Sequence, residues 1–253
     1  MMDSRILQMA VETTFCRYHD QCPGVQQRSV VNEPARGIIP RGMIVNQPDS
    51  PLDEIELVVL GQNPGQSNSF KRHLYMCLQR NESSEALYEE TNQALIDSFP
   101  ELPYWRNITS LLGALWPQGD AKRMLALEVA YCENAHGITD PGKATLDYCS
   151  SRHLERHLEM LRDGTFVLCV GGVAGAWFGH YGRRQKFRWF VADHLSGDWG
   201  ALSRLVDRTM GNLHGPVQAR WQSIVDGTSN GIHLEKADWH LRLVPAGKRK
   251  RDE

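Results

Sequence analysis

The chain has 253 residues, which suits one large α/β domain or at most two small ones. Hydrophobic residues make up 41% of the sequence and charged residues 23%, as is typical of a soluble globular protein with a sizeable core. The net charge of −2 excludes a molecule that attracts nucleic acid over its whole surface, so any basic surface must be local.

No apolar segment reaches the roughly 18 residues of a membrane span, and the N-terminus lacks a charged-then-apolar signal pattern. The six cysteines are scattered and none forms a CxxC pair, so we expect a reduced, cytoplasmic protein. Cys16, Cys22, Cys132 and Cys149 are candidates for a metal or an iron–sulfur cluster, but their spacings match no compact ligand pattern. We therefore expect no cofactor.

In chain order, helical periodicity covers 4–18, and proline, glycine and asparagine are frequent over 22–51, which predicts an extended arm or a long ordered loop. Short apolar runs predict strands over 56–60, 125–132, 165–170 and 187–192. Helices are expected over 69–79, 83–99, 104–115, 145–162, 173–178, 200–210 and 216–225.

Strands that alternate with helices predict an α/β fold. Right-handed βαβ crossovers would give a three-layer α/β/α architecture with a central, mostly parallel, about four-stranded sheet. We expect a single domain over 1–253, with an N-terminal arm at about 1–53 and a C-terminal extension at about 211–253.

The first of these strands ends in an unusual turn, from Gly61 to Ser67. Two glycines allow a tight turn and a close approach of a ligand to the backbone. Pro64 fixes its own φ and biases Asn63 towards an extended conformation, so the amide of Asn63 is held in place. Open α/β sheets bind their ligands at the carboxyl ends of their strands, where this turn would lie.

Two further strand ends also carry polar groups. Asn134 and His136 follow the second strand, and His194 and Ser196 follow the fourth. Because the carboxyl ends of parallel strands face the same way, we expect these side chains and Asn63 to converge on one cleft.

Other motifs leave alternatives open. The glycines from 171 to 175 invite a dinucleotide-binding interpretation, but Val170 stands where that fingerprint requires glycine, and close packing of a helix on a strand is the other interpretation. Basic and aromatic residues alternate just before the fourth strand. This run is either a solvated loop or a phosphate-binding segment near the cleft. Its basic residues are Arg183, Arg184, Lys186 and Arg188. The tail at 248–251 is also basic.

Two motifs together resemble the active-site motifs of the uracil-DNA glycosylase superfamily: Gly61-Gln62-Asn63-Pro64-Gly65 and His194-Leu195-Ser196. The first is similar to the Gly-Ile-Asn-Pro-Gly form of the mismatch-specific, thymine-DNA-glycosylase-like branch. Between them, 129–134 resembles the family strand that ends in a base-reading asparagine, and 153–172 its helix, apolar strand and glycine. The resemblance covers about 56–210.

The resemblance implies a monofunctional DNA glycosylase that hydrolyses the N-glycosidic bond of a nucleotide flipped out of duplex or single-stranded DNA. It gives Asn63 the role of orienting water below C1′, and His194 that of stabilising charge on the departing base. Implied base contacts are Gln62, Gly65, Phe70, Asn134, His136 and Ser196. Trp199 and Leu202 are candidates for the wedge that fills the space left in the base stack. Together with the basic residues of 183–188 they are the expected DNA contacts.

Gly65 decides the expected substrate. The strict uracil branch has a tyrosine there, which excludes groups larger than hydrogen at pyrimidine C5. Gly65 implies a pocket for damaged or C5-modified pyrimidines. These include modified cytosines, among them hypermodified phage bases, and also uracil and thymine. The implied role is DNA repair or antiviral defence.

Three alternatives stay open: a strict uracil-DNA glycosylase, a non-catalytic DNA-binding relative, and a nucleotide-binding oxidoreductase built on 171–175. We expect no membrane contact and no obligate protein partner.

Overall fold

The fold comes from a computed structural model, which describes residues 2–41, 43–66, 69–80, 84–115, 123–192 and 231–234. The strands are β1 (Val30–Val31), β2 (Ile44–Val45), β3 (Leu57–Gly61), β4 (Met124–Glu128), β5 (Glu133–Asn134), β6 (Phe166–Val170), β7 (Arg188–Ala192) and β8 (Gly231–Leu234). The helices are α1 (Ser4–Thr14), α2 (Pro23–Gln26), α3 (Ser69–Arg80), α4 (Ser84–Asp97), α5 (Pro103–Leu115), α6 (Lys143–Cys149), α7 (Glu155–Glu159) and α8 (Gly172–His180).

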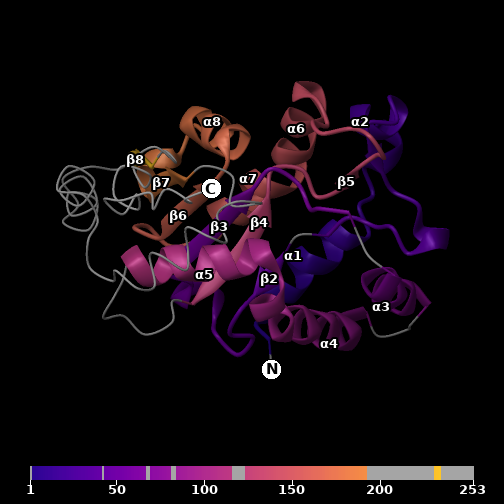
Figure 1. Ribbon diagram of the computed structural model, residues 1–253, viewed down its shortest axis with the longest axis horizontal. Helices are drawn as coiled ribbons and strands as arrows, with labels where there is room; N and C mark the ends of the chain where they lie inside the picture. The colour runs from indigo at the N-terminus through magenta and orange to yellow at the C-terminus, as the bar shows by residue number, and fades with distance from the viewer. Residues whose placement is uncertain are drawn as a thin grey trace, which may run out of the picture.

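The predicted α/β fold is confirmed. One mixed sheet has the order β2-β4-β3-β6-β7-β8, in which β2 is antiparallel and the other strands are parallel (Figure 1). Its four central strands are those that the apolar runs predicted. Two edge strands, β2 and β8, were not predicted. It also missed α2 and β1 within 22–51, which is therefore more structured than an extended arm. The helices expected over 200–210 and 216–225 lie outside the described residues.

The helix predicted over 145–162 is present and contains a π-helical turn, Ser150–Leu154, between α6 and α7. Such π-bulges interrupt the regular hydrogen-bond ladder and are frequent near functional sites. None of the helices in the described part of the chain is both long and apolar enough to cross a lipid bilayer.

Helices cover both faces of the sheet. Alternate residues of a strand face the same side of the sheet, and Val58 and Leu60 of β3 share one side. Both belong to the main core cluster, which also contains Ile6 of α1, Leu158 of α7 and Phe178 of α8. The crossover from β3 to β4 runs in the opposite direction to those from β4 to β6 and from β6 to β7. Because all these crossovers are right-handed, a crossover in the opposite direction lies on the opposite face of the sheet. The helix α5 therefore covers the face opposite α7 and α8, and its Ile108 and Leu111 are buried.

The order of the strands fixes where a ligand can bind. From β3 the chain first crosses to β4 on one side and later to β6 on the other, so the crossing direction reverses next to β3. Open α/β sheets bind ligands in the crevice outside the carboxyl ends of the strands at such a reversal. The turn after β3 begins at this point.

Candidate functional site

The carboxyl ends of β3 and β4 lie side by side. Gly61 pairs with Glu128, the last residue of β4. The pairing continues past the strands, because the amides of Val129 and Ala130 donate to the carbonyls of Gly61 and Gln62 at 3.0 and 2.9 Å. The turn is thus anchored to the segment that follows β4.

Gly61 leaves room for the side chain of Glu128. A Cβ atom there would lie 2.3 Å from Oε2 of Glu128 and 2.9 Å from its Cδ. The Glu128 carboxyl group therefore rests directly against the Gly61 backbone, in space that any side chain would fill.

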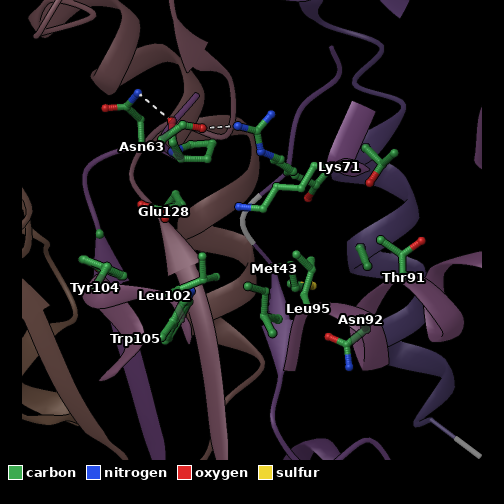
Figure 2. A pocket seen from close by; sticks show the side chains of 18 of the residues that line it. Met43, Asn63, Lys71, Thr91, Asn92, Leu95, Leu102, Tyr104, Trp105 and Glu128 are labelled. Carbon is green, nitrogen blue, oxygen red and sulfur yellow. Dashed lines mark hydrogen bonds between the residues drawn. The ribbon is translucent and has the colours of Figure 1, made fainter. Parts of the chain in front are cut away.

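These strand ends open into a cavity of about 380 Å³. Gly61, Gln62, Asn63, Pro64 and Gly65 form one wall, and Val170 at the end of β6 also contributes. The other walls come from α1, α3, α4, α5 and the segment around β2 (Figure 2). A cavity of this size lies in the range of small-molecule sites and has room for more than an unsubstituted pyrimidine.

Aromatic and basic side chains also line the cavity. Tyr88, Tyr104 and Trp105 line it, and the ring of Trp105 is stacked on that of Phe99 with 4.2 Å between their centroids. Lys71 reaches in from the side opposite Glu128 (Figure 2). Burial lowers the pKa of Lys71, as does the positive charge of Arg41, while Glu133 opposes the shift.

A buried ion pair holds the far end of the turn. Arg41 and Glu133 are 2.6 Å apart, with only 6% and 4% of their side chains exposed. Arg41 also donates a hydrogen bond to the carbonyl oxygen of Gly65, and its own amide donates to the carbonyl of Tyr131 at 2.8 Å. Removal of either charge would leave the other buried without its counter-charge.

Glu128 is the one carboxyl group among the described residues that line the cavity. Burial raises its pKa to about 8, and the positive charge of Arg41 opposes the rise. Glu128 is therefore mostly protonated at neutral pH, with one O–H donor and a carbonyl acceptor. Its Oε2 has no hydrogen-bond partner in the described part of the chain, and neither has Nε2 of Gln62.

The Asn63 amide sits at the rim. Its Nδ2 lies 3.5 Å from the carbonyl oxygens of both Pro64 and Cys132 (Figure 2 draws one of these contacts). Both distances are at the long limit of a hydrogen bond, so the amide is held only weakly and stays available to a ligand or a water molecule.

Three residues predicted for the site lie in the cavity wall: Gln62, Asn63 and Gly65. A Cβ atom at Gly65 would meet nothing within 4 Å in the described structure. The predicted base reader Asn134 does not line the cavity, because it lies in β5 and pairs with Val30 of β1. His136 is exposed in the turn after β5 and does not line the cavity either.

The basic run lies at the wrong edge of the sheet for the expected phosphate contact near the cleft. Arg188 begins β7 and is aligned through Phe166 with Leu57, at the amino end of β3, whereas Asn63 follows its carboxyl end. Arg183 forms an ion pair with Glu159 at 3.3 Å. Arg184 donates to the carbonyl of Tyr181, and Lys186 to that of Glu159.

Four predicted site residues lie outside the described residues: His194, Ser196, Trp199 and Leu202. Of Phe70, the described structure includes the backbone position in α3 but not the side chain.

Glu128, Lys71 and the aromatic residues of the cavity wall were not predicted from the sequence. An acidic residue at the end of an apolar run suggests an exposed strand end. The signal that could have identified Glu128 is its place in the chain, since it ends its strand as Gly61 ends β3.

Among the glycines of 171–175, Gly175 lets α8 pack closely on β7. A Cβ atom at Gly175 would lie 2.6 Å from Cγ1 of Val191 in β7. This is the packing interpretation that the sequence left open, and none of these glycines lines the large cavity.

A second, small cavity of about 20 Å³ lies near α2, lined by Cys16, Cys22, Cys132, Cys149 and His153 among others. Burial raises the pKa of Cys16 and brings that of Cys149 to about 12. These cysteines, far apart in sequence, are neighbours in the fold.

No family model matches the sequence, and no curated protein matches it.

Proposed function

We propose that the protein is a DNA glycosylase that hydrolyses the N-glycosidic bond of a flipped-out, C5-substituted or damaged pyrimidine. The observation that carries this proposal is the cavity at the carboxyl ends of β3 and β4, with Asn63 at its rim and Gly65 open beside it. The likeness of 61–65 and 194–196 to the two motifs of the uracil-DNA glycosylase superfamily supports the same chemistry.

The chemistry requires a nucleotide outside the stack, because C1′ and the base edge are unreachable inside the duplex. An amide such as Asn63 is no strong base, but it can orient water by hydrogen bonding. Most of the acceleration would then come from positioning and from electrostatic stabilisation of the oxocarbenium-like sugar and the departing base.

The size of the cavity supports a substituted base. Uracil alone would fill only a part of 380 Å³. Lys71 reaches into it, so a polar substituent at C5 would find an amine in the wall. Cytosines that carry hydroxymethyl or glycosyl groups belong to this class.

A substrate panel tests the proposal. The protein is incubated with DNA duplexes and single strands that contain uracil, a thymine mismatch or a C5-modified cytosine, and abasic sites are then cleaved with alkali. We expect strand breaks at C5-modified pyrimidines. Breaks confined to uracil would contradict the large-pocket proposal and leave a strict uracil-DNA glycosylase.

The second candidate is a DNA-binding relative without turnover. Its motivation is Leu195, which stands where the second motif of the superfamily usually has proline. A gel shift of modified duplexes without release of free base on any substrate would establish this alternative.

A further inference from the structure

The large cavity contains a carboxyl group that the proposed role of Asn63 does not involve. Glu128 ends β4 and lies against Gly61, and Gly61 begins the turn that carries Asn63. Figure 2 shows the Glu128 carboxyl group beside this turn, with Lys71 reaching in from the opposite side. A base whose sugar lies at Asn63 would therefore have Glu128 within its pocket.

The wall around Glu128 offers unused hydrogen-bonding atoms. Oε2 of Glu128 and Nε2 of Gln62 are both buried and lack a partner among the described residues. Both residues line the cavity next to Gly61, Glu128 across the pairing of β3 with β4 and Gln62 along the chain. Buried polar groups are nearly always hydrogen-bonded in folded proteins. These two atoms therefore indicate a ligand with a polar edge, such as a nucleobase.

The surroundings of Glu128 keep its proton in place. Burial raises its pKa to about 8, and the opposing charge of Arg41 is already paired with Glu133 at 2.6 Å. Among the described residues, β3 and β6 contribute no titratable side chain to this cavity. The charged and titratable groups of the other elements around Glu128 are Arg41, Lys71, Tyr88 and Tyr104, which line the cavity, and Tyr131, which follows β4.

A protonated carboxyl group matches the Watson–Crick edge of cytosine. Its O–H donates and its carbonyl oxygen accepts, whereas cytosine offers an acceptor at ring nitrogen N3 and a donor at its exocyclic amine. The same group can also bond to uracil, whose N3–H donates and whose O4 accepts. Hydrogen bonding alone therefore does not separate the two bases.

The two bases differ in how they leave. The uracil anion spreads its negative charge over two carbonyl oxygens and departs without a proton. Cytosine has an amine in place of one carbonyl, so its anion is less stable and departure requires a proton at N3. A proton donor at the base edge therefore matters far more for cytosine than for uracil.

We infer that Glu128 is the general acid for release of a cytosine-type base, an inference that rests on the proposed glycosylase activity. Its O–H would donate to N3, and its carbonyl oxygen would accept from the exocyclic amine. As the C1′–N1 bond breaks, its electron pair passes to the ring and the Glu128 proton moves to N3, so cytosine leaves neutral. Water then adds to C1′ and loses a proton to solvent, and Glu128 regains a proton from solvent.

Single-turnover rates for the unaltered protein and for E128Q test this role. The amide introduced in E128Q would keep a donor and an acceptor but could transfer no proton. We expect the rate on a modified cytosine to fall about 100- to 10,000-fold. The rate on uracil in the same flanking sequence should fall much less. E90Q is the matched control, because Glu90 is exposed on α4, a helix that lines the cavity through other residues.

The pH profile separates proton transfer from hydrogen bonding alone. At sub-saturating concentrations the rate reports the ionisations of the free protein. For the unaltered protein, the rate on modified cytosine should fall as the pH rises through about 8, where Glu128 loses its proton. E128Q should lack this fall. The same profile in both proteins would contradict the acid role.

Protein stability gives a readout that needs no substrate. Glu128 ionises near its ordinary value of 4.5 in the unfolded chain and at about 8 in the folded protein. The free energy of unfolding should therefore decrease as the pH rises from 4.5 to about 8. E128Q cannot ionise there, so its urea midpoint should fall less over this range. Equal falls in both proteins would show that Glu128 is already ionised in the folded state and would overturn its role as an acid.

The two levels of proposal fail differently. No base release by the unaltered protein on any substrate would overturn the glycosylase and this role with it. Release of modified cytosine by E128Q at the rate of the unaltered protein would overturn only the role of Glu128. An equal loss on cytosine and uracil in an E128Q protein that melts normally by circular dichroism would likewise overturn the acid role and leave the glycosylase in place.

Discussion

At the scale of single residues, the turn after β3 divides into positions with different tasks. Gly61 provides space for the Glu128 carboxyl group, whereas Gly65 leaves space that nothing in the described structure fills. Asn63 stands between them with weak contacts of its own. The proposed glycosylase therefore makes separate predictions for Asn63 and for Gly65.

The variant N63A should lose base release and keep DNA binding. If Asn63 orients the attacking water, its loss should lower the single-turnover rate by about 100- to 1,000-fold, as removal of one positioned polar group does in other enzymes. N134A is the control, because Asn134 lies in β5 outside the cavity wall. Loss of base release in N134A with full activity in N63A would contradict the assignment.

The variant G65Y should narrow the substrate range. A tyrosine at this position, as in the strict uracil branch, would enter the open space and exclude bulk at C5. We expect release of C5-substituted bases to fall by about 10- to 200-fold relative to uracil. G65A is the matched control, since its methyl group would meet nothing within 4 Å. Equal loss on all substrates would show a folding defect.

At the scale of elements, the packing of α8 on β7 depends on Gly175. In G175A the new methyl group would lie 2.6 and 2.9 Å from the two γ-carbons of Val191, so α8 and β7 would have to separate. We expect a loss of about 1–3 kcal/mol in the free energy of unfolding, measured with urea. G179A, in the same helix but with nothing within 4 Å of the new atom, should instead stabilise by about 0.5–1 kcal/mol. Similar values for both variants would contradict close packing at Gly175.

The parallel core was predictable because each of its strands is a continuous apolar run that ends in glycine or polar residues. The edge strands were not, since β2 has only two residues and forms through pairing with β4. The direction of the strands could have corrected one error: a basic run that precedes β7 must lie at the amino edge, away from Asn63. The position of Asn134 depends on its pairing with β1, which local sequence does not encode.

At the scale of the whole molecule, the two cavities are coupled through shared segments. The connection after β4 contributes Cys132 to the small cavity. The next residue, Glu133 at the start of β5, holds Arg41 and thus the carbonyl of Gly65 at the large cavity. The helix α1 lines the large cavity and leads into Cys16. The segments that carry the buried cysteines thus also form part of the wall of the large cavity.

A buried histidine makes the stability of the whole fold depend on pH. Burial lowers the pKa of His157 to about 3, and its Nδ1 lies 2.9 Å from the hydroxyl of Tyr131. Unfolded, His157 binds a proton below about pH 6.5, whereas the folded protein excludes it until about pH 3. Its contribution to stability is therefore complete above about pH 6.5 and is lost as the pH falls.

Between about pH 6.5 and about pH 4.5 this single group should reduce the free energy of unfolding by about 2 kcal/mol. H157Q should remove that part of the acid sensitivity, because an amide does not titrate and can still bond to Tyr131. H180Q, which changes an exposed histidine, should leave the pH dependence unchanged. Urea unfolding at a series of pH values measures the difference. If H157Q and the unaltered protein lose stability in parallel on acidification, His157 is not the group that excludes the proton.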